Sequence, residues 1–220
     1  MNAPEPQPGQ RPANVRPLRP LPPSGKGGIL KSFRNAYEGL LLAMRQRNMK
    51  FHVVSAVLVG LVGSGIRLEL AEKVTLIFCV MLVFFAEILN TALEALVDLH
   101  TEDFRENARK TKDAAAASVL VLAAGTVVIF AALVVHNWHV IVASGPQILR
   151  QSVLGLPLAA LTGAMLLEGA RPRWVDHLLF AGAMGLWLAL WPSSVSSVFS
   201  TLTGALVWLT WRASRRLHTP

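Results

Sequence analysis

Four polar residues lie within an apolar stretch of the chain and recur at the spacing of one α-helical face. They are Glu87, Asn90, Glu94 and Asp98, called the polar stripe below, and most residues between them are apolar. Offsets of 3, 7 and 11 residues from Glu87 place all four on one side of a helix. Charged side chains in a membrane span are costly, so they indicate a functional site.

The polar stripe has the residue types that metal-assisted phosphoryl transfer needs. Mg²⁺ commonly takes one or two carboxylates together with phosphate oxygens. A further carboxylate can take the proton of an attacking hydroxyl. A structural polar seam between helices and a proton relay in a transporter would use the same residue types. The residues alone leave these three interpretations open.

The depth of each carboxylate follows from the length of the span that carries it. If that span begins at Val74, about 20 residues rising 1.5 Å each cross the ~30 Å hydrocarbon core, and the inner interface falls near Leu93. Glu94 and Asp98 then lie at the cytosolic edge, whereas Glu87 lies one to two turns inside. We therefore expect Glu87 to meet lipid head groups and Glu94 to meet a cytosolic phosphate donor.

A basic segment follows the polar stripe. It reads Arg-Lys-Thr-Lys-Asp over residues 109–113 and leads into an alanine-rich run. Lys112 lies next to the stripe if the two spans pair as a hairpin, and a lysine there can hold phosphate oxygens as a point charge. For Asp113, two interpretations remain: an N-cap of the next span, or a contact to the adenine or ribose of a nucleotide.

The composition indicates an all-α integral membrane protein. The chain has 220 residues, of which 53% are hydrophobic and 15% charged, against about 25% charged in soluble domains. Its mean hydropathy is +0.46, and the apolar residues form long blocks typical of membrane spans. A single cysteine, Cys79, excludes a secreted disulfide scaffold. The net charge of +8 comes from basic residues between the apolar blocks, so it indicates membrane topology and no nucleic-acid partner.

Three regions are expected along the chain. Residues 1–28 form a disordered Pro/Gly-rich tail, residues 29–136 a core with three spans, and residues 137–220 an accessory region with about three more. The core opens with a basic amphipathic helix over residues 29–50, in the inner interface. Pro157 makes the fourth span the weakest prediction. The six expected spans are residues 51–66, 74–97, 114–135, 153–167, 175–191 and 195–211.

The basic residues orient these spans. With the N-terminus inside, 18 of the 21 Lys and Arg residues fall in inner segments, and only Arg67, Lys73 and Arg150 fall outside. The positive-inside rule therefore predicts a multi-pass protein of the inner membrane with both termini in the cytosol. Residues 136–152 are expected at the outer interface.

Three ordered motifs resemble those of the prokaryotic diacylglycerol kinase family. Residues 87–98, EILNTALEALVD, resemble E-I-L-N-[ST]-A-[IL]-E-x-[VL]-V-D, and residues 112–119, KDAAAASV, resemble K-D-x-x-[AS]-[AG]-[AS]-V. Residues 47–52, RNMKFH, resemble R-N-M-[RK]-x-H of its undecaprenol kinase branch. The resemblance covers about residues 29–136. It implies a surface helix and three spans, a homotrimer with shared active sites, and phosphate transfer from Mg·ATP to a lipid hydroxyl.

The resemblance also implies a role for each matching residue. Glu87 would be the general base, and Asn90 would orient groups at the reacting centre. Glu94 would bind the metal that bridges the ATP phosphates. Lys112 would hold phosphate oxygens, and Asp113 would contact the nucleotide.

The RNM motif adds two candidate residues, and the residue before it is a departure from the family pattern. Asn48 and His52 would lie at the nucleotide or the lipid head group, although His52 has a structural interpretation as well. The family usually has a metal-binding glutamate at the position of Gln46. Because a neutral amide binds Mg²⁺ more weakly, the departure predicts a looser metal site. Glu38, two helical turns earlier, is a candidate replacement.

Two functions from different classes follow. The first is an ATP-dependent lipid kinase that acts on undecaprenol or diacylglycerol, with the RNM motif favouring undecaprenol. The second is a non-catalytic membrane scaffold or transporter-like protein that retains the kinase framework, and Gln46 together with the accessory spans motivates it. No family is recognised in residues 137–220.

Overall fold

The computed structural model describes residues 28–100, 106–167 and 172–215. The chain divides into two compact units, residues 1–36 and residues 37–220. The first unit contributes the opening turns of helix α1, where Ile29, Leu30 and Phe33 are exposed. The Pro/Gly-rich tail expected over residues 1–28 lies outside the described residues except for Gly28. The helices that carry the candidate site all belong to the second unit.

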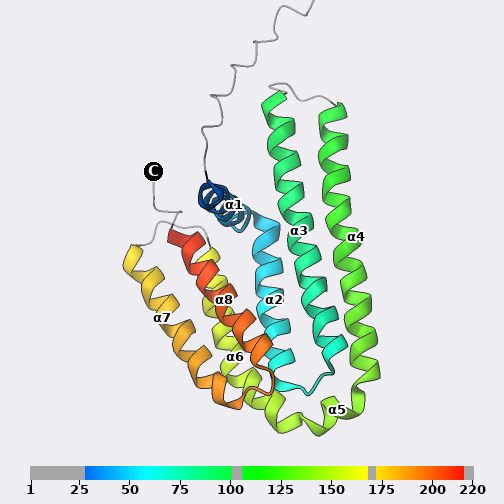
Figure 1. Cartoon of the computed structure of the whole chain (residues 1–220), viewed down its shortest axis with the longest axis vertical. Coiled ribbons are helices and arrows are strands. Elements are labelled where there is room, and N and C mark those ends of the chain that lie inside the picture. Colours follow the sequence, from blue (N-terminus) through cyan, green and yellow to red (C-terminus); the bar gives the residue numbers. More distant parts are fainter. Residues whose placement is uncertain (1–27, 101–105, 168–171, 216–220) are drawn as a thin grey trace, which may run out of the picture. The chain divides into compact units, whose positions relative to one another are not determined.

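All regular structure in the described ranges is helical, as the composition predicted (Figure 1). Helices α3 and α4 are the longest, at 31 residues each. The complete order is α1 (Ile29–Ala43), α2 (Arg47–Gly65), α3 (Leu70–His100), α4 (Glu106–His136), α5 (Trp138–Ala143), α6 (Gly145–Leu166), α7 (Arg173–Leu190), the 3₁₀ turn η1 (Trp191–Ser193) and α8 (Ser197–Ser214).

The amphipathic helix expected over residues 29–50 is broken in two. Helix α1 ends at Ala43, and the backbone N–H of Gln46 donates to the carbonyl of Ala43 over 3.0 Å, which tightens a turn. Gln46 itself is extended, and α2 begins at Arg47. The turn lets the end of α1 and the start of α2 bury their apolar residues in one cluster: Leu41, Ala43, Met44, Met49 and Val53 with Leu166 and Ala213. The RNM motif therefore opens α2 instead of ending the surface helix.

Five of the described helices, α2, α3, α4, α6 and α7, are long and apolar enough to cross a membrane. Helix α6 begins at Gly145 instead of residue 153 and keeps Pro157 inside it. Helix α8 occupies the place of the expected sixth span but is not among these five. Several of its polar residues face inward, since Ser200, Thr203, Thr210 and Ser214 are all buried. The sixth span therefore stays a prediction.

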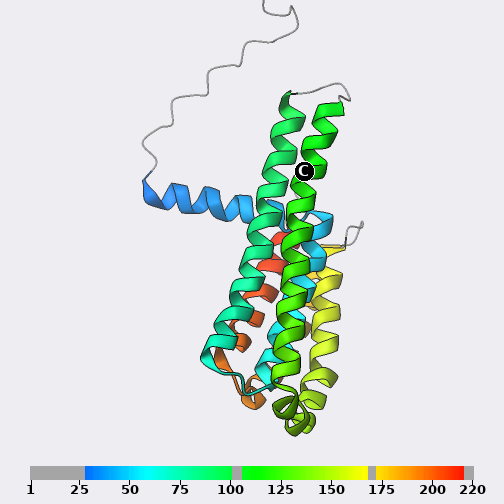
Figure 2. The same cartoon turned by 90° about the vertical axis from the view of Figure 1, so that its right-hand side faces the viewer.

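Helix α2 joins the two halves of the bundle. It packs against α3 on one side and against α6 and α8 on the other, while α3 pairs with α4 and α6 pairs with α7 (Figures 1 and 2). Small residues permit the close approach of α2 and α8: a Cβ on Gly63 would lie 2.7 Å from the ring of Phe199. The main core cluster lies at this seam and includes Val57 and Leu61 of α2, Leu158 of α6, and Leu206 and Val207 of α8.

The α7–α8 contact yields a stability prediction. A Cβ on Gly204 would lie 2.7 Å from the indole of Trp187, whose N–H donates to the carbonyl of Ser200 over 2.8 Å and so holds the ring in place. Gly204→Ala should therefore cost about 1–3 kcal/mol through overpacking and lower the melting temperature in detergent. Gly185→Ala is the matched control, because nothing lies within 4 Å of its Cβ position. Equal melting temperatures of the two variants would contradict this account of the contact.

Candidate active site

The polar stripe follows α3 from a buried end to an exposed end. Glu87 and Asn90 are only 1% and 4% exposed, Glu94 is half-buried, and the side chain of Asp98 is 65% exposed. The helical spacing therefore does bring these residues onto one face. Glu87 is the most buried carboxylate of the stripe.

Helix α2 places His52 beside Glu87. The imidazole Nε2 lies 3.2 Å from Glu87 Oε1, without the alignment of a hydrogen bond, so this buried carboxylate oxygen has no donor. The resemblance placed His52 at the nucleotide or the lipid head group. In the structure its side chain is 24% exposed and contacts Glu87 directly. Sequence spacing could not reveal this pair, because its two residues lie on different helices.

Asn90 and Glu94 form the next contact along α3. The Asn90 amide Nδ2 donates to Glu94 Oε1 over 2.9 Å. The amide oxygen of Asn90 is buried and has no hydrogen-bond partner. An amide oxygen and a carboxylate are the ligand types that Mg²⁺ takes, so the two residues fit one side of a cation site. In the described part of the chain, no three His, Cys, Asp or Glu side chains come together to hold a metal. A cation held here would need further oxygen ligands, such as those of a phosphate.

The α3–α4 hairpin brings Lys112 to the exposed end of the stripe, as the sequence predicted. Its Nζ lies 2.5 Å from Asp98 Oδ1. The N-cap interpretation of Asp113 is wrong, because α4 begins at Glu106 and Asp113 lies inside the helix. Asp113 is exposed and accepts a hydrogen bond of 3.1 Å from Arg109 Nη1, one turn earlier.

Gln46 and Asn48 lie at the start of α2, where both are exposed. The Gln46 side chain makes no capping hydrogen bond to that helix. The contacts of the stripe with His52 and Lys112 and the contact between Asn90 and Glu94 involve neither Gln46 nor Asn48. Gln46, assigned to the metal, and Asn48, assigned to the nucleotide, thus remain assigned by resemblance alone.

Comparison with known proteins places most of this helical region in a family. Residues 34–134 match the prokaryotic diacylglycerol kinase family. A diacylglycerol kinase of Synechocystis sp. is 36% identical over 124 residues, which cover 56% of this chain and 71% of the relative. The chain belongs to the prokaryotic diacylglycerol kinase family. An undecaprenol kinase of Bacillus subtilis is 36% identical over 96 residues, covering 43% of this chain and 78% of the relative. No solved structure matches.

Membership of the diacylglycerol kinase family makes the chain a membrane-embedded lipid kinase that uses ATP. A diacylglycerol kinase of Escherichia coli is also similar, at 31% identity over 94 residues, or 42% of this chain and 77% of the relative. The match over residues 34–134 includes every candidate site residue. Helices α5 to α8 lie beyond it and form the part of the fold that the family match does not cover.

The Asp98–Lys112 pair yields a prediction for this site. Both side chains are substantially exposed, and exposed ion pairs contribute about 0–1 kcal/mol. In a double-mutant cycle of Asp98→Asn and Lys112→Met, followed by unfolding in detergent, the coupling free energy should stay below about 1 kcal/mol. A much larger coupling would show that the pair is structural and that Lys112 is not available to a phosphate.

Proposed function

We propose that this kinase phosphorylates the primary hydroxyl of undecaprenol, with ATP as donor, at the cytosolic face of the inner membrane. The observation that carries the proposal is the placement of buried Glu87 and exposed Lys112 at opposite ends of one polar stripe. The related diacylglycerol and undecaprenol kinases are equally similar, at 36% identity each, so identity does not select the acceptor. The RNMKFH segment at residues 47–52 favours undecaprenol over diacylglycerol.

In the proposed reaction, Glu87 takes the proton of the lipid hydroxyl. The hydroxyl oxygen forms a bond to the γ-phosphorus, the bond from that phosphorus to the bridging oxygen of ATP breaks, and ADP leaves with the electron pair. His52 acts as a positioning residue, because its contact at 3.2 Å restrains the Glu87 carboxylate. Lys112 turns from Asp98 to the phosphate oxygens, and Asp113 and Asn48 contact the nucleotide.

Glu94 and the amide oxygen of Asn90 would hold Mg²⁺, with Gln46 as a weaker third ligand. When bound, the ion would neutralise negative charge on the ATP phosphates. The unpartnered Asn90 oxygen supports this assignment, because a buried acceptor without a donor is costly unless a ligand satisfies it. The same amide, bonded to Glu94 through Nδ2, orients that carboxylate.

The proposal includes a homotrimer with active sites shared between subunits and with both chain termini in the cytosol. A second face of α3 supports the homotrimer. This face carries five exposed apolar side chains at helical spacing: Val74, Phe78, Met81, Phe85 and Leu89. A neighbouring subunit can cover such a stripe. The concentration of basic residues in the inner segments supports the orientation.

Phosphate transfer from labelled Mg·ATP in detergent, with undecaprenol and diacylglycerol side by side, tests the function. Product with undecaprenol is the expected result, and product with diacylglycerol alone would overturn the assigned acceptor. A second measurement asks whether bound Mg·ATP protects Lys112 against an amine-labelling reagent. No product and no protection would favour the scaffold alternative, whereas protection without product would indicate a site weakened at Gln46.

Glu87→Gln tests the base. It removes the group that accepts the proton while preserving the side chain's size, so kcat should fall by at least about a hundredfold, the low end of what a general base contributes. The melting temperature should stay within a few degrees of the wild type. Glu106→Gln on α4 is the control, because Glu106 is exposed and pairs with Lys110 one turn away. Activity of Glu87→Gln at the wild-type level would exclude the proposed mechanism.

Glu94→Gln tests the metal assignment. Loss of the carboxylate charge should raise the Mg²⁺ concentration for half-maximal activity by roughly tenfold or more, the range seen when a metal site is weakened. Excess Mg²⁺ should restore part of the rate. Glu87→Gln, measured in parallel, should show no such rescue. If Glu94→Gln left the Mg²⁺ titration unchanged, Glu94 would not be a metal ligand.

A further inference from the structure

Gln151, a buried residue of α6, has an amide group without a hydrogen-bond partner. Its side chain is 3% exposed, and both the amide nitrogen and the amide oxygen are buried and unpaired among the described residues. A buried amide in this state is costly, because it has given up its hydrogen bonds to water. Gln151 lies beyond residues 34–134, which match the kinase family, and the proposed reaction does not use it.

The side chain of Gln151 lines a small pocket between α2 and α6. The pocket has a volume of about 60 Å³, which is room for about two water-sized groups at ~30 Å³ each. Apart from Gln151 and the half-buried Ser152, its lining residues are apolar. The stem of Gln151 is held against α2, because a Cβ on Gly65 would lie 3.0 Å from the Gln151 Cγ. The unpaired amide is therefore fixed at the wall of a pocket.

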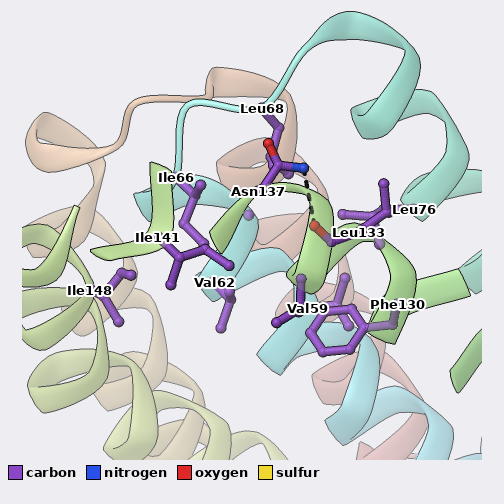
Figure 3. Close-up of a pocket in the computed structure, with 12 residues that line it drawn as sticks. Val59, Val62, Ile66, Leu68, Leu76, Phe130, Leu133, Asn137, Ile141 and Ile148 are labelled. Atoms are coloured by element: carbon purple, nitrogen blue, oxygen red, sulfur yellow. Dashed lines mark hydrogen bonds between the residues drawn. The ribbon is translucent and has the colours of Figure 1, made fainter. Parts of the chain in front are cut away.

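A larger neighbouring cavity provides a contrast. It has a volume of about 200 Å³, shares Val62 and Ile148 with the small pocket, and is drawn in Figure 3. Its one polar lining residue is Asn137, whose amide nitrogen already donates to the carbonyl of Leu133 over 3.1 Å. Of the two pockets, the small one at Gln151 is therefore the one that offers an amide with both its donor and its acceptor unpaired.

The small pocket opens towards the lipid. Leu58 and Val62 of α2 and Leu156 of α6 line it and are 37%, 39% and 59% exposed. Both helices are long and apolar enough to cross a membrane, so these exposed side chains meet acyl chains and not water. A ligand that enters from this side arrives as part of a membrane lipid.

The lining of the pocket selects for a small neutral polar group. Its residues carry no charge, and an anionic phosphate without a cation is strongly unfavourable in such a place. The Gln151 amide needs an acceptor for its N–H and a donor for its oxygen, and one hydroxyl group is both. The pocket has room for a hydroxyl and the carbon that bears it.

We propose that Gln151 binds the hydroxyl of a lipid alcohol in this pocket, while the alkyl chain lies outside along Leu58, Val62 and Leu156. The hydroxyl accepts a hydrogen bond from the amide nitrogen and donates one to the amide oxygen. The choice of an alcohol over other neutral lipids rests on the proposed function, whose substrate is a lipid alcohol.

The site is separate from the polar stripe. Leu61, which lines the pocket, is 9 residues from His52 on α2. That interval is about two and a half helical turns, so the two residues point to opposite sides of α2. The accessory helices therefore hold a second molecule of the substrate class, away from the one that reacts at Glu87.

Photolabelling of the native chain tests where the alcohol binds. The probe is an octanol that carries a photoreactive diazirine near its hydroxyl, in vesicles of phosphatidylcholine, which has no hydroxyl of its own. Light should attach the probe to Ser152, Leu156 or Val62, and an excess of octan-1-ol should suppress this labelling severalfold. Octane should not suppress it. Equal suppression by octane would show a groove that does not need the amide, and stronger suppression by octanoic acid would assign the site to fatty acids. Either result, or no label on these residues, would overturn the proposal.

Gln151→Leu tests the role of the amide. The substitution breaks no hydrogen bond of the amide among the described residues, so the variant should fold. Labelling of the pocket should fall roughly tenfold, because two neutral hydrogen bonds to the hydroxyl are lost. Gln147→Leu is the matched control, since Gln147 lies one turn earlier on α6, is exposed and does not line the pocket. Unchanged labelling of Gln151→Leu would show that the amide does not bind the alcohol, and would overturn the proposal.

The labelling needs no ATP, so its result is independent of kinase activity. Labelling that depends on Gln151 in a chain that phosphorylates no lipid would retain the alcohol site and overturn the proposed function. Phosphorylation of undecaprenol without labelling at the pocket would do the reverse. The kcat of Gln151→Leu should equal that of the wild type, and a fall in kcat at an unchanged melting temperature would overturn the separation of the two sites.

Discussion

The structure depends on how a carboxylate is kept inside an apolar helix. Glu87 is 1% exposed on a helix that is long and apolar enough to span a membrane, and an unpaired charge there is strongly unfavourable. His52 of α2 lies 3.2 Å from this carboxylate, so α2 lies against α3 at this depth. A base that is both buried and restrained follows from one contact between two helices.

That contact in turn requires support for α2. The side of α2 away from α3 packs on α6 and α8, and Gly63 lets Phe199 approach closely. Gly155 of α6 meets α2 in the same way, because a Cβ there would lie 2.9 Å from Leu61. The helices beyond the family match therefore pack closely against α2. They contribute no residue to the polar stripe.

Helical periodicity predicted much of this site, but it could not predict contacts between helices. The common face of Glu87, Asn90 and Glu94 and the approach of Lys112 to Asp98 both follow from regular helices in an antiparallel hairpin. The break after Ala43 was missed because the burial of Met44 depends on packing. The early start of α4 was missed although its first turns are exposed and carry the local pairs Glu106–Lys110 and Arg109–Asp113. The His52–Glu87 pair and the apolar cavity likewise require the relative rotation of helices, which composition and spacing do not specify.

The hydrogen bond from Asn137 to Glu72 gives the α3–α4 hairpin a second point of attachment. Asp98 and Lys112 tie the exposed end of the hairpin, whereas Glu72 and Asn137 tie the other end and are both buried. The second contact lies at the far end of both helices from the first and involves no residue of the polar stripe. The register of α3 against α4 is therefore held at a point that does not depend on which partner Lys112 takes.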